Sequence, residues 1–355
     1  MNNSQNKRAG RKFNVMLQSD RIEAFVKLRH ALQTMDSRER AALASAAKNE
    51  NGWFTAESVN MALDGICKLL EPDILSAWTR RYPLEPKAPA TIGVAMAGNI
   101  PAVGFHDYLC VLLAGHHLKA KLSSSDTVLL KFIHQQLGQI DPALTARVEW
   151  SDRLNHTDAM IATGSDNTAR YFEYYFRGIP HIIRKNRSSC AVIVGEEPEA
   201  EFVQLGADIF SYFGLGCRSV SKIFIPQDFD PAQLLTSWKS YAAVIDHHKY
   251  ANNYDYQKSL LLLNQSKFLD GEIVLLRESD QLVSPVATVF YERYNSQDAL
   301  RKRLEEEKKK IQVIVSAQAW YPGSIPFGTA QWPAVDDYAD GIDTMKFLQG
   351  VKTAG

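Results

Sequence analysis

Cys217 is the residue of this sequence whose type and setting best suit covalent chemistry. A predicted helix, Pro198–Tyr212, and the glycines Gly214 and Gly216 come before it. The apolar run Lys222–Pro226, which is typical of a strand, comes shortly after it. A thiolate at such a turn can face a cleft and attack a carbonyl carbon, provided that backbone N–H groups or cations lower its pKa. A lone cysteine is also often a buried core residue, which is the alternative here.

Asn99 lies after another predicted strand, Thr91–Ala97, and directly before the stretch Ile100–Pro101. In an open parallel sheet the carboxyl ends of the strands face the ligand crevice. An asparagine amide at that edge can donate a hydrogen bond to a developing oxyanion. The alternative is an ordinary turn residue before a helix that starts with proline.

Lys121, Ser123 and Ser124 end the next predicted strand, Leu118–Leu122. A lysine and hydroxyl groups at this edge suit the ribose and phosphate of a nucleotide. Capping of the following helix by a nearby serine or by Asp126 is compatible with that function.

Thr163, Gly164 and Ser165 end a further strand and open a helix. The free backbone N–H groups of a helix start favour phosphate. The sequence has no GxGxxG stretch, so a conventional dinucleotide fingerprint is absent.

The elements that would position these residues alternate between strand and helix from Thr91 onward, which predicts an α/β fold with doubly wound parallel sheets. A first series covers residues 91–176 and a second covers 191–316, so we expect two lobes with a cleft between them. Helices are predicted from Asp20 to about Pro83, and residues 1–15 form a polar arm. The expected division is 16–188 with 326–355 for the first lobe and 189–325 for the second.

Composition restricts the possible functions. Forty basic residues balance 40 acidic ones, so no global field recruits nucleic acid or anionic lipid. The four cysteines are scattered without a CxxC pair, which argues against a zinc site or a disulfide framework and favours a reducing compartment. The N-terminus lacks a secretory signal, and polar residues break the most apolar stretch, so we expect a cytoplasmic protein without a membrane span.

The two histidine pairs, His116-His117 and His247-His248, are the remaining candidates for metal ligands. Adjacent side chains on a strand or loop point apart, and no further ligands stand at metal-site spacing, so no metal is expected.

Five stretches, in this order and spacing, resemble motifs of the aldehyde dehydrogenase superfamily. They are Gly93-Val94 with Asn99-Ile100-Pro101, Ala114-Gly115 with Lys121-Leu122-Ser123-Ser124, Thr163-Gly164-Ser165, Gly214–Phe224, and Ile325-Pro326-Phe327-Gly328. The stretches 162–172 and 184–189, Ser284-Pro285 and Asp337–Gly341 look like signatures of its LuxC-type acyl-CoA reductase branch. That branch reduces fatty acyl thioesters to aldehydes with NADPH through an acyl-cysteine.

The resemblance implies an aldehyde dehydrogenase-like fold, with Cys217 as the nucleophile and an oxyanion hole formed by Asn99 and the backbone N–H of Cys217. It assigns the cofactor, NADPH or possibly NADH, to a further set of residues: Lys121, Ser123, Ser124, Thr163, Gly164, Ser165, Gln281, Pro326 and Phe327. The expected substrate is an acyl-CoA or acyl-protein thioester. A homodimer and a partner enzyme that transfers or activates the acyl group are family-level expectations.

Three departures from the superfamily pattern bear on the reaction and on the cofactor. The stretch Lys185–Cys190 lacks the glutamate that activates water in aldehyde oxidation, so an acyl-cysteine would survive to be reduced or transferred. Ser124 stands where members that prefer NAD carry a glutamate, which leaves room for a 2′-phosphate. Gln281 replaces a ribose-binding glutamate. Reduction of another activated acyl group, such as an acyl phosphate, and a non-catalytic scaffold of the same fold remain alternatives.

Overall fold

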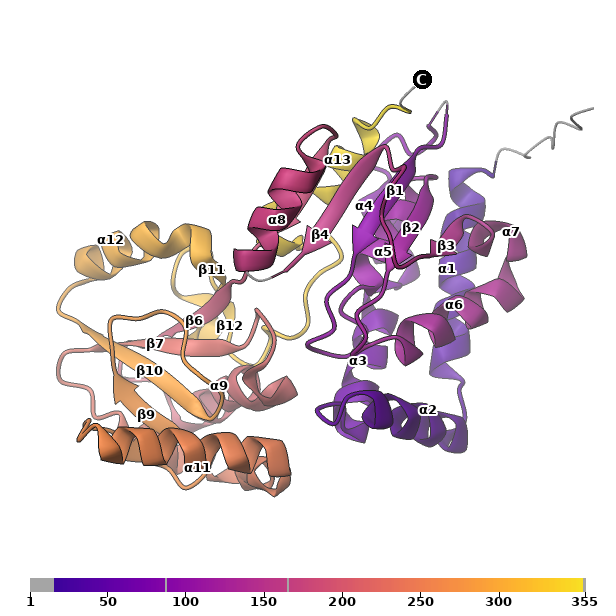
Figure 1. Ribbon diagram of the computed structural model, residues 1–355. Coiled ribbons are helices and arrows are strands. Elements are labelled where there is room, and N and C mark those ends of the chain that lie inside the picture. The colour runs from indigo at the N-terminus through magenta and orange to yellow at the C-terminus, as the bar shows by residue number, and fades with distance from the viewer. Residues whose placement is uncertain (1–15, 87, 165, 354–355) are drawn as a thin grey trace, which may run out of the picture.

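The computed structural model describes residues 16–86, 88–164 and 166–353, which form two α/β lobes, each around its own sheet (Figure 1). Sheet A, in the first lobe, is five-stranded and entirely parallel, with strand order β3-β2-β1-β4-β5. Its strands are β1 (Thr91–Ala95), β2 (His117–Lys121), β3 (Val148–Trp150), β4 (Ala159–Thr163) and β5 (His181–Arg184).

The strand order of sheet A reverses between β1 and β4. Right-handed crossovers therefore place the helices that follow β1 and β2 on one face and the helix that follows β4 on the other. Figure 1 shows α8 (Asp166–Phe176) in front of β4 and α5 (Phe105–Leu113) on the far side. Such a reversal opens a crevice at the carboxyl ends of the strands.

Helices from both ends of the chain complete the first lobe. Thr55 caps α3 by accepting a hydrogen bond from the backbone N–H of Ser58, and α4 begins at Pro72, as the sequence predicts. The remaining elements are α1 (Gln18–Gln33), α2 (Ser37–Glu50), α3 (Ala56–Leu69), α4 (Pro72–Thr79), α6 (Val128–Ile140), α7 (Pro142–Thr145) and α13 (Thr344–Gln349).

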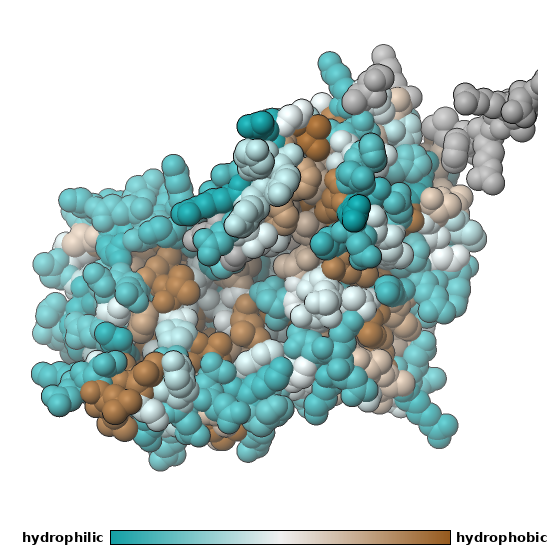
Figure 2. Space-filling model, viewed as in Figure 1, coloured by the Kyte–Doolittle hydropathy of each residue, from teal (hydrophilic) through white to brown (hydrophobic). Residues whose placement is uncertain are grey.

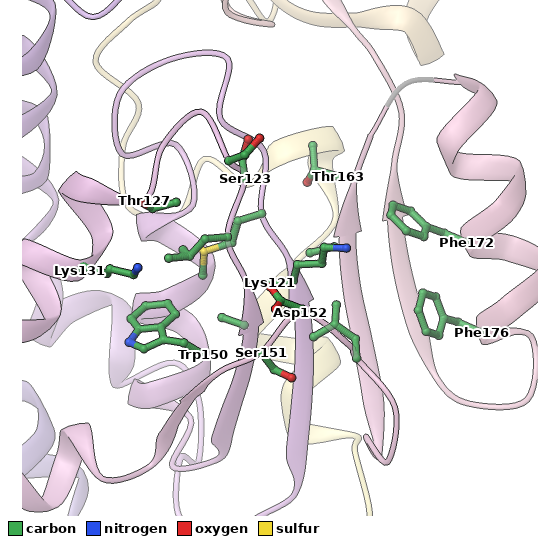
Figure 3. A pocket seen from close by; sticks show the side chains of 16 residues that line it. Lys121, Ser123, Thr127, Lys131, Trp150, Ser151, Asp152, Thr163, Phe172 and Phe176 are labelled. Atoms are coloured by element: carbon green, nitrogen blue, oxygen red, sulfur yellow. The ribbon is translucent and has the colours of Figure 1, made fainter. Parts of the chain in front are cut away.

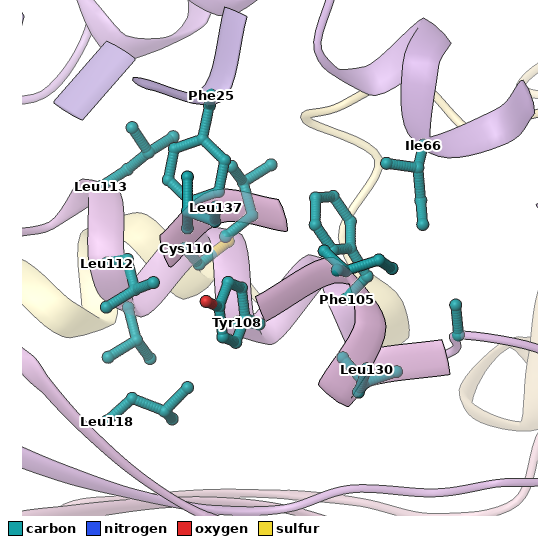
Figure 4. Packing of buried hydrophobic residues seen from close by; sticks show 14 of the residues in the cluster. Phe25, Ile66, Phe105, Tyr108, Cys110, Leu112, Leu113, Leu118, Leu130 and Leu137 are labelled. Carbon is teal, nitrogen blue, oxygen red and sulfur yellow. The ribbon is translucent and has the colours of Figure 1, made fainter. Parts of the chain in front are cut away.

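The core of the first lobe lies between α5 and its neighbours. Figure 4 shows Phe105 and Tyr108 of α5 among Phe25 of α1 and Leu130 and Leu137 of α6, and all five residues are at most 1% exposed. Cys110 is buried in the same cluster. This core anchors the strands whose ends carry the candidate site.

Sheet B, in the second lobe, has seven strands in the order β12-β11-β6-β7-β10-β9-β8, and only β8 runs antiparallel to its neighbour. The strands are β6 (Ser188–Val192), β7 (Val220–Pro226), β8 (Leu269–Asp270), β9 (Leu275–Glu278), β10 (Thr288–Tyr294), β11 (Ile311–Ser316) and β12 (Ile325–Pro326). The helices are α9 (Glu199–Phe210), α10 (Ala232–Ser237), α11 (His248–Leu263) and α12 (Gln297–Glu307). Figure 1 shows α12 on one face of the sheet and α9 with α11 on the other.

The chain crosses between the lobes twice. The first crossing joins Arg184 of β5 to Ser188 of β6. The chain returns to the first lobe after residue 330. Phe327 and Ala330 still pack in the core of the second lobe, and Val335 is the next residue along the chain that packs in the core of the first lobe. In Figure 1 the yellow chain makes this crossing, and Figure 2 shows hydrophobic residues gathered in the furrow between the lobes.

The short strands β3 and β5 were not predicted from the sequence, and the helix before Cys217 is shorter than predicted. That helix, predicted to reach residue 212, ends at Phe210 and is followed by a 3-10 turn, Ser211–Gly214. The predicted arm, residues 1–15, lies outside the described residues.

Candidate active site

A strained turn presents Cys217 between α9 and β7. Tyr212 (φ 50°) and Phe213 (φ 58°) adopt the left-handed conformation, which is rare for bulky residues, and Gly214 follows with φ 75°. The hydroxyl of Ser189 on β6 donates to the carbonyl oxygen of Cys217 at 3.0 Å. The turn is thus held to sheet B, while Cys217 itself is exposed.

The thiol of Cys217 is surrounded by opposing electrostatic influences. It keeps contact with solvent, yet the protein atoms packed around it withhold water and raise the pKa of the thiol above its ordinary value. Arg218 and, more weakly, the backbone N–H of Cys217 and Arg184 lower that pKa, whereas Asp340 raises it. In the free protein at pH 7 the group is therefore mostly the protonated thiol.

Asn99 lies against the turn that carries Cys217. Its amide Nδ2 donates to the carbonyl oxygen of Leu215 at 2.8 Å, two residues before the cysteine. Ile100 packs beside Gly216, since a Cβ atom built on that glycine would lie 3.6 Å from the Ile100 Cδ1 atom. The amide has a second N–H donor, so an oxyanion can be bound without breaking the first hydrogen bond. The structure thus brings the two predicted catalytic residues together across the furrow.

A mostly apolar cavity of about 210 Å³ opens at Cys217. One wall is the α3 face formed by Met61, Ala62, Gly65, Ile66 and Leu69. The opposite wall belongs to residues 331–334, where Trp332 lies under the ammonium group of Lys68, with 3.4 Å between the nitrogen and the ring centroid. The cavity can therefore take an apolar group that is attached to the cysteine.

A second, larger pocket of about 780 Å³ lies at the carboxyl ends of the strands of sheet A. It contains Lys121, Ser123, Ser124 and Thr163, so four of the predicted cofactor residues share one site. Figure 3 shows Phe172 and Phe176 of α8 forming one wall and Trp150 with Lys131 on the opposite side. Two aromatic walls, hydroxyl groups and two lysines suit a nucleotide.

Close packing of loops holds this pocket open. A Cβ atom on Gly98 would lie 2.5 Å from the Ser123 side chain, so only glycine lets the loops after β1 and β2 approach this closely. The Glu50 carboxylate accepts from the backbone N–H groups of Thr127 and Val128, at 2.7 and 3.1 Å, and from the Thr127 hydroxyl. Glu50 therefore occupies the N-terminus of α6, where an anion could otherwise bind.

The other predicted cofactor residues are placed differently. Gly164 follows β4, where its backbone N–H donates to the carbonyl oxygen of Arg184 at 3.2 Å, and Ser165 lies outside the described residues. Phe327 is 1% exposed in the core of the second lobe, so its side chain packs there instead of facing the nucleotide pocket. Pro326 is an exposed residue of β12.

Gln281 is exposed on the loop between β9 and β10, and its place in a cofactor site stays a prediction. The fully buried Lys222 of β7 holds this loop in place. The ammonium group of Lys222 donates to the carbonyl oxygens of Ser279 and, at 3.2 Å, Gln281. Glu292 neutralises Lys222 at 2.6 Å.

The acidic residues near the chain's end do not share the first turn of the last helix. Asp343 alone caps α13, by accepting from the backbone N–H of Lys346. The others pair with arginines: Asp336 with Arg81 at 2.9 Å, Asp337 with Arg218 at 2.6 Å and Asp340 with Arg187 at 3.1 Å. We call residues 331–343 the return segment. Its ion pairs join the segment to the N-terminal helices, to the Cys217 turn and to the first crossing.

Sequence reasoning missed Lys131, Trp150 and Phe176 as pocket residues. Trp150 ends β3, a strand of three residues that is too short to show an alternating pattern. Lys131 and Phe176 lie on helices, and a helical residue can be assigned to a ligand only once the face turned to the pocket is known. Lys131 could have been proposed from the sequence, because it lies one helical turn after Thr127, the residue that precedes α6.

Within residues 16–86, 88–164 and 166–353, no helix is long and apolar enough to cross a membrane, and no group of three histidine, cysteine, aspartate or glutamate residues could hold a metal ion. His116 and His247 each use a ring nitrogen on a backbone carbonyl, that of Leu348 at 3.0 Å and that of Gly52 at 2.8 Å. Both histidines thus take part in packing.

No protein-family model and no curated protein sequence matches this chain, but solved structures do. An aldehyde dehydrogenase from Bacillus cereus, in complex with NAD⁺, is 15% identical with a TM-score of 0.60, and the match covers 85% of this chain and 72% of that one. A Mycobacterium tuberculosis aldehyde dehydrogenase complexed with NAD⁺ is 9% identical with a TM-score of 0.64, and the match covers 94% and 84%. Aldehyde dehydrogenase C from Pseudomonas syringae, a variant bound to NAD⁺ and octanal, is 11% identical with a TM-score of 0.59, over 85% and 72%. The chain has the aldehyde dehydrogenase fold, as its motifs predict.

Proposed function

We propose that this protein reduces an acyl thioester, an acyl-CoA, to the aldehyde with a nicotinamide cofactor, through an acyl group bound to Cys217. The observation that carries the proposal is the position of Cys217. Its thiol opens into an apolar cavity beside the Asn99 amide, in a fold whose first lobe has a nucleotide-sized pocket at the carboxyl ends of its strands. An acyl tail can occupy the cavity while the carbonyl carbon lies at the sulfur.

The first step exchanges one thioester for another. The sulfur of Cys217 attacks the acyl carbonyl carbon, the carbonyl oxygen gains negative charge, and the free N–H of Asn99 with the backbone N–H of Cys217 would stabilise it. The carbon–sulfur bond to CoA breaks, and the proton lost by Cys217 is the one that the CoA sulfur gains. Arg218, the largest influence that lowers the pKa of Cys217, favours the thiolate required for attack.

The surroundings of Cys217 favour reduction over hydrolysis. Asp337 is the one carboxylate among the described residues that line the cavity, and Arg218 holds it at 2.6 Å. Asp340, the other carboxylate that influences the thiol, pairs with Arg187. Neither carboxylate is free to activate water, and His106, which also lines the cavity, uses its Nε2 on the carbonyl oxygen of Val335 at 2.8 Å. An acyl-cysteine would therefore persist until it is reduced.

The larger pocket supports a phosphorylated cofactor. When bound, the reduced nicotinamide would supply the hydride that converts the acyl-cysteine to the aldehyde. The carbon–sulfur bond breaks, Cys217 leaves as the thiolate, and a proton from water returns it to the thiol. Lys121 and Lys131 offer two cations to a 2′-phosphate, and Ser124 leaves space where a carboxylate would repel it. We therefore propose NADPH as the preferred donor, because of these two lysines. Asp152, also in the pocket, can accept from ribose hydroxyls and so allows NADH to serve as the weaker donor.

The test combines two measurements on the purified protein. NADPH absorbance is followed with an acyl-CoA series, and the intact mass is recorded with acyl-CoA alone. We expect acyl-CoA-dependent loss of NADPH and addition of one acyl group, both abolished by Cys217→Ala. Both should be retained by Cys67→Ala, a buried cysteine of α3 whose sulfur lies against Arg29 and does not line the cavity. An acyl adduct without NADPH oxidation would reassign the hydride donor, whereas the absence of both would refute the proposal and favour a scaffold.

A further inference from the structure

A second cavity adjoins the one beside Cys217. It measures about 570 Å³ and is lined by the start of α3, by the turn before Cys217 and by the 3-10 segment Trp238–Asp246. Its walls include Thr55, Ser58, Phe210, Phe213, Tyr241 and Val244. Met61 and Tyr212 line both cavities, so these two side chains form the partition between them.

One face of α3 runs along both cavities. Ser58 faces the second cavity, Met61 the partition, and Ile66 and Leu69 the first. These positions recur at helical spacing, and at 1.5 Å per residue the stretch from Ser58 to Leu69 is about 16 Å long. The two cavities thus lie next to each other along one face of α3. The first, at Cys217, is mostly apolar, and the second is lined by both apolar and polar residues.

The two residues of the partition differ in mobility. Tyr212 is fixed by its left-handed backbone and by the neighbouring Phe213, whose ring lies 4.4 Å from that of His247 and 5.4 Å from that of Trp53 between centroids. Met61 is half-buried on α3 and has a flexible, unbranched side chain that adapts to what lies beside it. A chain can therefore pass when Met61 changes rotamer, while Tyr212 remains in place.

The size of the first cavity requires such a path for a long substrate. At about 210 Å³ it is smaller than the roughly 300–1,000 Å³ of ordinary small-molecule sites, whereas the second cavity lies within that range. We propose that the acyl tail passes between Met61 and Tyr212 into the second cavity, so that this pair and the second cavity determine the longest acyl chain accepted. The inference rests on the proposed function.

The test is a set of substitutions at increasing distance from the sulfur, each measured with acyl-CoAs of increasing length. Burial of each further methylene should raise kcat/KM about fourfold until the path is filled. We expect kcat/KM to stop rising at the shortest acyl chain in Met61→Trp and at the longest in the wild type. Ala243→Trp, which fills only the second cavity, should lie between them. The ratio of long-chain to short-chain kcat/KM should fall at least tenfold in Met61→Trp and less in the volume-matched Met61→Leu.

A measurement on the wild type avoids any dependence on the folding of these variants. Acyl-CoAs with a photoreactive diazirine at the tail end are allowed to acylate Cys217 and are then irradiated. We expect short tails to label Gly65–Leu69 or residues 331–334 and long tails to label residues 240–247.

Three outcomes separate the possibilities. A profile unchanged by Ala243→Trp, or long tails that label only the first cavity, would overturn the inference while the proposed function stands. Failure of every acyl-CoA to acylate wild-type Cys217 would overturn the proposed function and with it this inference.

Discussion

The reactivity of Cys217 depends on a few charges, of which Asp340 and Arg218 act in opposite directions on its pKa. Replacing Asp340 by asparagine removes a negative charge that raises the pKa. We expect Asp340→Asn to increase the thiolate fraction at pH 7 and the rate of alkylation by iodoacetamide several-fold, and to move the pH profile of that rate to lower pH.

Asp336→Asn is the matched control for that measurement. Asp336 also pairs with an arginine of the first lobe, Arg81, but it is not among the groups that influence Cys217. Equal rates in the wild type and Asp340→Asn would show that the charge of Asp340 does not reach the thiol.

Lys121 and Lys131 are expected to determine the choice of cofactor. A charge-assisted hydrogen bond to phosphate contributes about 1.5–3 kcal/mol, so Lys121→Ala or Lys131→Ala should raise the KM for NADPH roughly tenfold or more and change that for NADH less. Lys119→Ala serves as the control, because Lys119 lies on the same strand but pairs with Glu149 at 3.1 Å and does not line the pocket. A similar increase for both cofactors would contradict a specific role with the 2′-phosphate.

For single residues, the position in the fold could be predicted where the residue belongs to a local motif. Asn99, Lys121 and Thr163 stand at or just after the carboxyl ends of β1, β2 and β4, so strand direction already indicates that they share one edge of sheet A. Cys217 precedes β7 of sheet B and is marked by its glycine-rich turn instead. Phe327 could not be placed in this way, because its motif does not indicate that the side chain packs in the core of the second lobe.

Among the elements, α9 and the stretch after β12 are connected by a buried carboxylate. Asp208 of α9 is fully buried and accepts from the backbone N–H groups of Gly328 at 2.7 Å and Ala330 at 2.9 Å. Burial raises the pKa of Asp208 to about 6, although these two hydrogen bonds oppose the rise. At a pH between the two pKa values, Asp208 is therefore protonated in the folded protein and ionised in the unfolded chain.

The sign of the resulting pH effect follows from that difference. Between about pH 4 and pH 6 the contribution of Asp208 to the free energy of unfolding decreases as pH rises, and Asp208→Asn lacks this dependence. We expect the destabilisation caused by Asp208→Asn to be about 2 kcal/mol larger at pH 4.5 than at pH 7, as measured by urea unfolding. Equal destabilisation at both pH values would show that the pKa of Asp208 is not raised.

The predicted elements failed where tertiary contacts override local pattern. The helix before Cys217 continues in sequence beyond Phe210, but the aromatic contacts of Phe213 with Trp53 and His247 stabilise a left-handed turn instead. Those partners lie far away in the sequence, so no local pattern indicates them. Strand β3, with three residues, is too short to show an alternating pattern.

The whole molecule places two candidate ligand sites on different elements. The nucleotide pocket lies at the strand ends of sheet A, and the apolar cavity lies between α3 and the return segment. In Cys217→Ala, which binds without turnover, we expect NADPH to slow hydrogen exchange in residues 121–127 and 150–154. Acyl-CoA should slow exchange in α3 and in residues 331–334. Protection of the same peptides by both ligands would argue against separate sites.

The double crossing between the lobes has a consequence for synthesis. Residues 188–330 leave the ribosome as one uninterrupted stretch that contains all of sheet B, so the second lobe can close its core early. The first lobe waits longer, because Val335, Tyr338, Met345 and Leu348 complete its core only after the second lobe has emerged. During that interval α5 exposes an apolar surface to the cell, and the lobe made first is the lobe finished last.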